Sequence, residues 1–117
     1  MKNEFIVFEN QKETVKINLH DIVAVTCEGT CLTIHYSREL KKFTFSKSLV
    51  QVEEILKNIN SCIWLRIHRN SIVSLEKIEM LDKRNCKVVL QGGLKLNVSV
   101  RKLSLANKMI KEKLRIQ

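Results

Sequence analysis

A polar cluster between two apolar runs concentrates side chains suited to binding an anion. It lies within residues 65–75 and consists of Arg66, His68, Arg69, Asn70 and Ser71. No carboxylate is present there to neutralise the two arginines. The planar fork of an arginine fits a phosphate or the edge of guanine, and asparagine and serine add short, directional hydrogen bonds. These residue types predict contact with an anion, while a solvated polar loop between two strands is the plainer alternative.

The distribution of charge along the chain favours the anion. The 117 residues carry 21 Lys and Arg against 12 Asp and Glu, a formal net charge of +9. Residues 1–60 hold eight basic and eight acidic side chains, whereas residues 61–117 hold thirteen and four, so the whole surplus falls in the half that contains the polar cluster. Such asymmetry predicts a polyanionic partner, nucleic acid first and an anionic membrane surface second.

Sequence motifs of catalysis are lacking. The chain has no Gly-rich phosphate loop before a helix, no paired carboxylates, and no grouping of Ser, His and an acid that suggests a triad. His68 stands between two arginines, so a hydrogen bond to phosphate suits it better than a role as a base. We therefore expect a protein that is not an enzyme and that uses no cofactor.

The four cysteines, at positions 27, 31, 62 and 86, are too few and too scattered for a disulfide scaffold. We expect thiols in a reducing compartment and no metal. Cys27 and Cys31 flank Glu28-Gly29-Thr30, which leaves open a disulfide across a hairpin or a metal pair as minor alternatives. The amino terminus lacks the apolar core of a signal peptide, and no run approaches the ~20 apolar residues of a membrane span, so we expect a cytoplasmic protein.

Short segments with a period of two, the pattern of half-buried strands, fill most of the chain. They predict strands near residues 5–8, 15–19, 22–26, 32–36, 40–45, 63–67, 72–75, 77–81, 86–90 and 94–98. Turn residues separate them, including the glycine of Glu28-Gly29-Thr30, which allows a tight hairpin. Regular spacing of short strands indicates antiparallel sheets.

Two segments have the period of a helix instead. Apolar residues at 49, 52, 56 and 59, with Ser48 and Gln51 as a capping box, predict a helix over residues 49–58. A stripe at 103, 106, 110 and 114 predicts a second helix after Ser99, with a basic outer side. The expected fold is mostly β, with small antiparallel sheets, a short mid-chain helix and a C-terminal helix, in one domain spanning residues 1–117.

Three separated segments resemble the LytTR DNA-binding domain of bacterial transcription regulators. They are residues 17–25, 66–73 and 94–101, and the helix at 49–58 precedes the second of them. The resemblance covers nearly the whole chain. It implies an elongated domain of small antiparallel sheets whose loops, rather than a recognition helix, enter the major grooves of DNA.

The resemblance also implies three DNA-contacting loops: the tip at Glu28-Gly29-Thr30, the central loop with Arg69 and Asn70, and the junction Ser99-Val100-Arg101. We expect base contacts from Thr30, Arg69 and Arg101. We expect backbone contacts from six residues, namely Ser48, His68, Asn70, Asn97, Ser99 and Lys102. Arg66, set inside a strand, is expected to brace the fold.

The sequence thus predicts sequence-specific binding of double-stranded DNA in bacterial transcription regulation. The alternative is a basic module that binds a protein partner or an anionic membrane surface without reading DNA sequence. A homodimer on repeated half-sites stays open. So does a receiver domain that precedes this chain in a longer response regulator, of which the chain would be the output domain.

Overall fold

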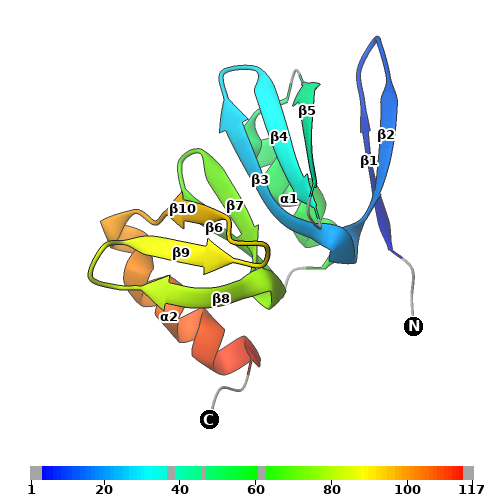
Figure 1. The fold of residues 1–117 in the computed structure, drawn as a ribbon. Coiled ribbons are helices and arrows are strands. Elements are labelled where there is room, and N and C mark those ends of the chain that lie inside the picture. Colours follow the sequence, from blue (N-terminus) through cyan, green and yellow to red (C-terminus); the bar gives the residue numbers. More distant parts are fainter. Residues whose placement is uncertain (1–3, 37–38, 46, 61–62, 115–117) are drawn as a thin grey trace.

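The computed structural model describes residues 4–36, 39–45, 47–60 and 63–114 (Figure 1). In these residues the chain forms three antiparallel sheets and two α-helices, with extents of 44 × 35 × 24 Å. The architecture confirms the predicted mostly β class with two helices. The strands are short because turns interrupt the alternating pattern every few residues.

A five-stranded sheet in the order β5-β4-β3-β7-β6 forms the centre of the molecule. Strand β3 pairs antiparallel with both β4 and β7, with Glu28 opposite Cys31 and Thr26 opposite Ser71. Because β3 runs toward one hairpin tip and β7 runs away from another, both tips lie at the same end of the sheet. The strands are β3 (Ile22–Glu28), β4 (Cys31–Tyr36), β5 (Glu39–Thr44), β6 (Trp64–His68) and β7 (Ser71–Ser74).

One face of this sheet is covered by the hairpin of β1 (Phe5–Glu9) and β2 (Thr14–Asn18) and by α1 (Leu49–Ile59). The core between them contains three phenylalanines in mutual contact, at 8, 43 and 45, with ring centroids 5.7 to 6.2 Å apart. Burial of such large rings contributes most to a core of this size. The hairpin and α1 are therefore held to the sheet by apolar packing.

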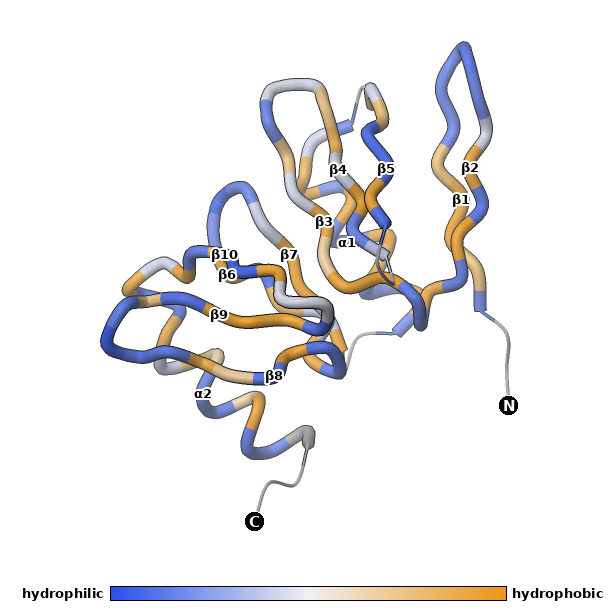
Figure 2. The backbone as a smooth tube through the Cα atoms, viewed as in Figure 1, coloured by the Kyte–Doolittle hydropathy of each residue, from blue (hydrophilic) through white to orange (hydrophobic). Residues whose placement is uncertain are grey.

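The opposite face of the sheet packs against β8 (Ile78–Asp82), β9 (Lys87–Leu90), β10 (Lys95–Asn97) and α2 (Val100–Leu114). These three strands form their own sheet in the order β10-β9-β8. Figure 2 shows the apolar segments running along the inner strands, with polar residues at the turns. Alternation along the central strands thus supplies two cores, one on each face. The second core includes Val23, Ile67, Val73, Val88 and Ala106.

The capping box predicted for α1 is present. The Gln51 N–H donates to Ser48 Oγ at 3.3 Å, and the Ser48 N–H donates to Gln51 Oε1 at 2.9 Å. Two backbone donors at the helix start are satisfied in this way, which sets where the helix begins. Val52 and Leu56 then face the core.

The predicted elements are found, with shifts at their ends. Leu19, Leu75 and Lys77, predicted in strands, lie in the 3₁₀ turns Leu19–Asp21 and Leu75–Lys77. Both turns begin with a fully buried leucine. The alternation of apolar and polar residues therefore continues from the strand into the turn, and the sequence pattern does not show where the strand ends. Cys86, predicted to begin a strand, has φ of 52° in the turn before β9. The predictions for Cys62 and for the side chains at 114 and 115 lie outside the described residues.

Cys27 and Cys31 point to opposite faces of the β3–β4 hairpin. Glu28 lies opposite Cys31, and Cys27 lies opposite Leu32. Since successive side chains of a strand alternate, this register separates the two thiols and contradicts the alternative of a disulfide across the hairpin. Cys27, Cys31 and Cys86 are free, and no group of three His, Cys, Asp or Glu side chains among the described residues could hold a metal ion.

Replacing Cys27 and Cys31 together by serine should change the unfolding free energy by no more than ~0.5 kcal/mol, or about 2 °C in melting temperature. The Cys27 thiol donates to the Gly29 carbonyl at 3.1 Å, a bond that a serine hydroxyl can replace. Thermal melting with and without reductant measures the effect. A melting temperature that depends on reductant in the wild type, and not in the double variant, would contradict two free thiols.

Candidate nucleic-acid interface

Backbone hydrogen bonds bring the three predicted DNA-contacting loops to one side of the molecule. The Cys27 N–H donates to the Asn70 carbonyl at 2.9 Å, which joins the β3–β4 tip to the β6–β7 turn. The Ser99 N–H donates to the Ile67 carbonyl at 2.8 Å, which joins the start of α2 to the same hairpin. In Figure 1 the two tips and this junction follow one another along the upper left of the view. We call this side the loop edge.

The start of α1 reaches the same end of the central sheet. The Phe45 N–H donates to the Thr30 carbonyl at 2.9 Å, and α1 begins four residues later at Leu49. The exposed side chains of Lys47 and Ser48 therefore lie near the β3–β4 tip. Lys47 is a cation of the loop edge that the sequence did not single out, because only the pairing of β4 with β5 carries residue 47 to this tip.

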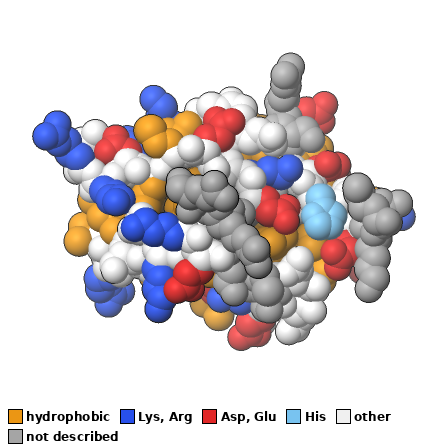
Figure 3. Space-filling model, turned by 90° about the horizontal axis from the view of Figure 1, so that it is seen from below, with side chains coloured by type: hydrophobic (Ala, Val, Ile, Leu, Met, Phe, Trp, Pro, Cys, Tyr) orange, Lys and Arg blue, Asp and Glu red, His pale blue; other side chains and the backbone are white. Residues whose placement is uncertain are grey.

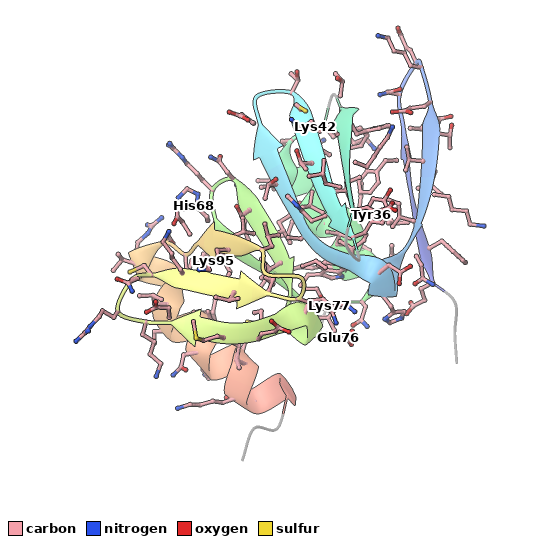
Figure 4. All side chains as sticks on the ribbon, viewed as in Figure 1. Tyr36, Lys42, His68, Glu76, Lys77 and Lys95 are labelled. Carbon is pink, nitrogen blue, oxygen red and sulfur yellow. The ribbon has the colours of Figure 1, made fainter. Side chains whose placement is uncertain are left out.

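Arg69 and Asn70 form the two-residue turn between β6 and β7, and both are exposed. Arg66 Nη2 donates to the Arg69 carbonyl at 2.8 Å, which closes the turn from within. The Asn70 N–H donates to His68 Nδ1 at 3.4 Å, so the other ring nitrogen of a neutral His68 is its N–H donor. Figure 4 places His68 at this hairpin. The Arg69 guanidinium has no partner among the described residues. It projects from a turn whose backbone is held by the Arg66 side chain.

One member of the polar cluster is not on the surface. Ser71 is only 7% exposed and lies opposite Thr26 and His68 in the central sheet. Ser71 is the first residue of β7, and its side chain points into the protein. The surface groups of the cluster are therefore Arg69 and Asn70, with His68 half-buried.

The junction between β10 and α2 brings the remaining predicted contacts together. Asn97 is exposed and lies opposite Lys87 of β9. Ser99 is half-buried, and its carbonyl accepts from the Lys102 N–H at 2.9 Å. Arg101 is exposed in the first turn of α2, whereas Lys102 is half-buried. All nine predicted contact residues thus reach the surface at least in part.

Residues 12–111 match the family model of the LytTr DNA-binding domain. The chain belongs to this family. A solved LytTr DNA-binding domain, from a methyl-accepting/DNA response regulator of Bacillus cereus, has the same fold with a TM-score of 0.69 at 15% identity. The alignment covers 94% of this chain and 98% of that one. A comparison with curated protein sequences found no match. The LytTr resemblance stated from the sequence is confirmed, and the family is one of DNA-binding domains rather than enzymes.

Among the described residues of this LytTr domain, no ion pair involves a lysine or arginine of residues 61–117. The four found among the described residues join side chains between Glu4 and Glu76 only. Beyond Glu76, Asp82 accepts hydrogen bonds from the Asn85 side chain and backbone, which lower the pKa of Asp82. Seen from below, Lys and Arg side chains gather toward the left of the molecule, the side of β8, β9, β10 and α2 (Figure 3). This charge is available to an external polyanion.

An open groove of about 450 Å³ between the β4–β5 pair and the β9–β10 turn lies apart from the nine predicted contacts. Of its lining residues, His35 and Glu39 are the titratable ones. Burial lowers the pKa of His35, whose Nε2 lies 3.1 Å from Thr26 Oγ1, so His35 is a neutral hydrogen-bonding group at neutral pH. The described lining residues include no Ser, Thr or Cys, and we assign the groove no catalysis. Among the described residues, no helix has the length and apolar character needed to cross a membrane.

Loss of the Arg66 side chain should lower stability before it affects DNA binding. Arg66→Ala removes the 2.8 Å hydrogen bond to the Arg69 carbonyl and should cost about 1 kcal/mol, or roughly 4 °C in melting temperature. Arg84→Ala is the matched control, because it removes an exposed arginine from the turn between β8 and β9. Thermal melting of both variants measures the difference. Equal melting temperatures would mean that Arg66 does not brace the turn.

Proposed function

We propose that this LytTr domain binds double-stranded DNA at specific sequences and regulates transcription, with its loops inserted in major grooves. One observation carries the proposal: backbone hydrogen bonds align two hairpin tips and the starts of α1 and α2 along one edge, where Arg69 and Arg101 have no carboxylate partner among the described residues. Arginine at a turn can extend to the edge of a base, which a side chain in the middle of a sheet cannot. The proposal takes residues 1–117 as one DNA-binding unit.

Base readout is assigned to Thr30, Arg69 and Arg101, which are exposed and have side chains without a partner among the described residues. A guanine offers two acceptors in the major groove that match the two donors of an arginine fork. A threonine contributes a hydroxyl and a methyl group, so Thr30 can meet either a polar edge or a thymine.

Phosphate contacts are assigned to six residues that flank these three. They are Ser48, His68, Asn70, Asn97, Ser99 and Lys102. Such contacts hold the protein in register without reading sequence. The Ser48 hydroxyl accepts from the Gln51 N–H and donates to Gln51 Oε1 at 3.4 Å, so a phosphate contact would exchange this long hydrogen bond for one to a phosphate oxygen. We add Lys47 to this set, because it is exposed and directly precedes Ser48 in the chain.

We extend the proposal to the output half of a response regulator, with a receiver domain as its partner and a homodimer on repeated half-sites as the DNA-bound form. The support is the shared fold with the LytTr domain of the Bacillus cereus response regulator. Sedimentation of the protein on duplexes with one and with two half-sites tests the dimer. Independent binding of two copies to the double site, with no gain in affinity, would refute it.

Binding to an anionic membrane surface is the competing interpretation. Membrane-surface proteins anchor through exposed aromatic side chains, and the exposed aromatic of the described residues is Phe5, on β1 rather than at the loop edge. A gel shift with duplexes from a randomised library, beside sedimentation with phosphatidylserine vesicles, separates the two. We expect selection of a preferred duplex and no sedimentation. Vesicle binding without preference among duplexes would overturn the proposed function.

A further inference from the structure

The start of α2 carries a large apolar side chain in the middle of the loop edge. Val100, the first residue of α2, is 75% exposed, more than any other large hydrophobic residue described. It stands between Ser99, whose N–H binds the Ile67 carbonyl, and Arg101. Folding does not account for it, because an exposed valine gains little from burial and is a poorer helix former than alanine.

The charge and polarity of the residues near Val100 indicate which kind of binding partner could contact it. No Asp or Glu occurs from Lys83 to Lys111. Leu103, one turn further along α2, is half-buried against the second core, and the other exposed large apolar residue of α2, Leu105, lies five residues on, so Val100 is the one large apolar side chain exposed in the first turn of α2. A protein or membrane surface that buries apolar area would require a patch. A polyanion with isolated methyl groups fits better, and DNA has them at the C5 position of thymine in the major groove.

We propose that Val100 reads a thymine through contact between its methyl groups and the C5 methyl of the base. This inference rests on the proposed function. Successive residues of a helix point about 100° apart, so the side chains of Val100 and Arg101 diverge and reach different base pairs of the same groove. The expected recognition element is a thymine adjacent to the base pair contacted by Arg101.

The experiment uses the duplex recovered from a randomised library by the full chain. Each thymine is replaced singly by deoxyuridine, which lacks only the methyl group. We expect roughly fourfold weaker binding of the wild type at one thymine, the effect of one buried methyl group. Val100→Ala should bind the unmodified duplex more weakly by a similar factor and should be insensitive to deoxyuridine at that position. Leu105→Ala, another exposed apolar residue of α2, is the control and should keep the wild-type sensitivity.

Three results would overturn the reading of thymine by Val100. They are a selected duplex without thymine, equal deoxyuridine sensitivity in the wild type and Val100→Ala, and the same loss of sensitivity in Leu105→Ala. Thermal melting verifies that each variant is folded. Failure of the wild type to prefer any duplex would refute the proposed function itself, whereas preference without the Val100 coupling refutes this inference alone.

Discussion

Raising the salt concentration fourfold, from 50 to 200 mM, is expected to weaken DNA binding at least a few hundredfold. Each neutralised phosphate releases condensed counterion, which gives a slope of about −0.9 per contact in a plot of log affinity against log salt. The proposed phosphate contacts and the unpaired cations of residues 61–117 predict a slope of roughly −4 to −8. Titration by fluorescence anisotropy over this range measures it.

A variant that lacks one lysine provides a control for the salt experiment. Lys102→Ala removes one proposed phosphate contact and should make the slope shallower by about one unit, on specific and random duplexes alike. A wild-type slope near zero would refute the polyanion assignment. An unchanged slope in the variant would remove Lys102 from the set of phosphate contacts.

Arg69→Ala and Arg101→Ala should each lower affinity for the selected duplex roughly 5- to 150-fold, and affinity for random duplex much less. A bidentate arginine on guanine discriminates against the wrong base by about 1–3 kcal/mol, whereas a phosphate contact contributes to every sequence equally. Both side chains are exposed and free of carboxylate partners in the described residues, so no internal ion pair is lost with them. Binding is titrated on the selected duplex and on a scrambled one.

Two further variants separate geometry from charge in this prediction. Arg69→Lys keeps the positive charge and loses the fork, so it should lose preference for the selected duplex while keeping its affinity for the scrambled one. Lys102→Ala should weaken both by similar factors. If folded Arg69→Ala and Arg101→Ala proteins lose both kinds of binding in equal proportion, these arginines do not read bases.

Local features were predicted correctly because their causes are local in the sequence. The capping box at Ser48 and Gln51 needs only two side chains three residues apart, and the turn at Arg69 and Asn70 needs only the break between two apolar runs. Some strand ends were wrong in detail. Leu19, Leu75 and Lys77 were expected in strands and lie in 3₁₀ turns, because a period of two cannot distinguish a strand from a buried 3₁₀ turn that continues it. Cys86 was expected to begin a strand and lies in the positive-φ turn before β9.

Contacts between distant segments could not be derived from the pattern. The pairing of β3 with β7 carries the Cys27 N–H to the Asn70 carbonyl and so sets two hairpin tips side by side. The register of the β3–β4 hairpin turns Cys27 and Cys31 apart, although their spacing in the sequence leaves either arrangement open. Such register depends on which apolar residues share a core, and that is a property of the assembled sheet.

By itself, the sequence determined the class of fold, the positions of most strands and both helices, the excess of positive charge in residues 61–117, and membership of the LytTr family. Periodicity, capping and charge are properties of residues near one another in the chain. The tertiary structure alone decided that Lys47 lies near the Thr30 tip, that Ser71 is buried, and that Val100 is exposed. These placements follow from strand pairing and from packing on the two faces of one sheet, which join residues far apart in sequence.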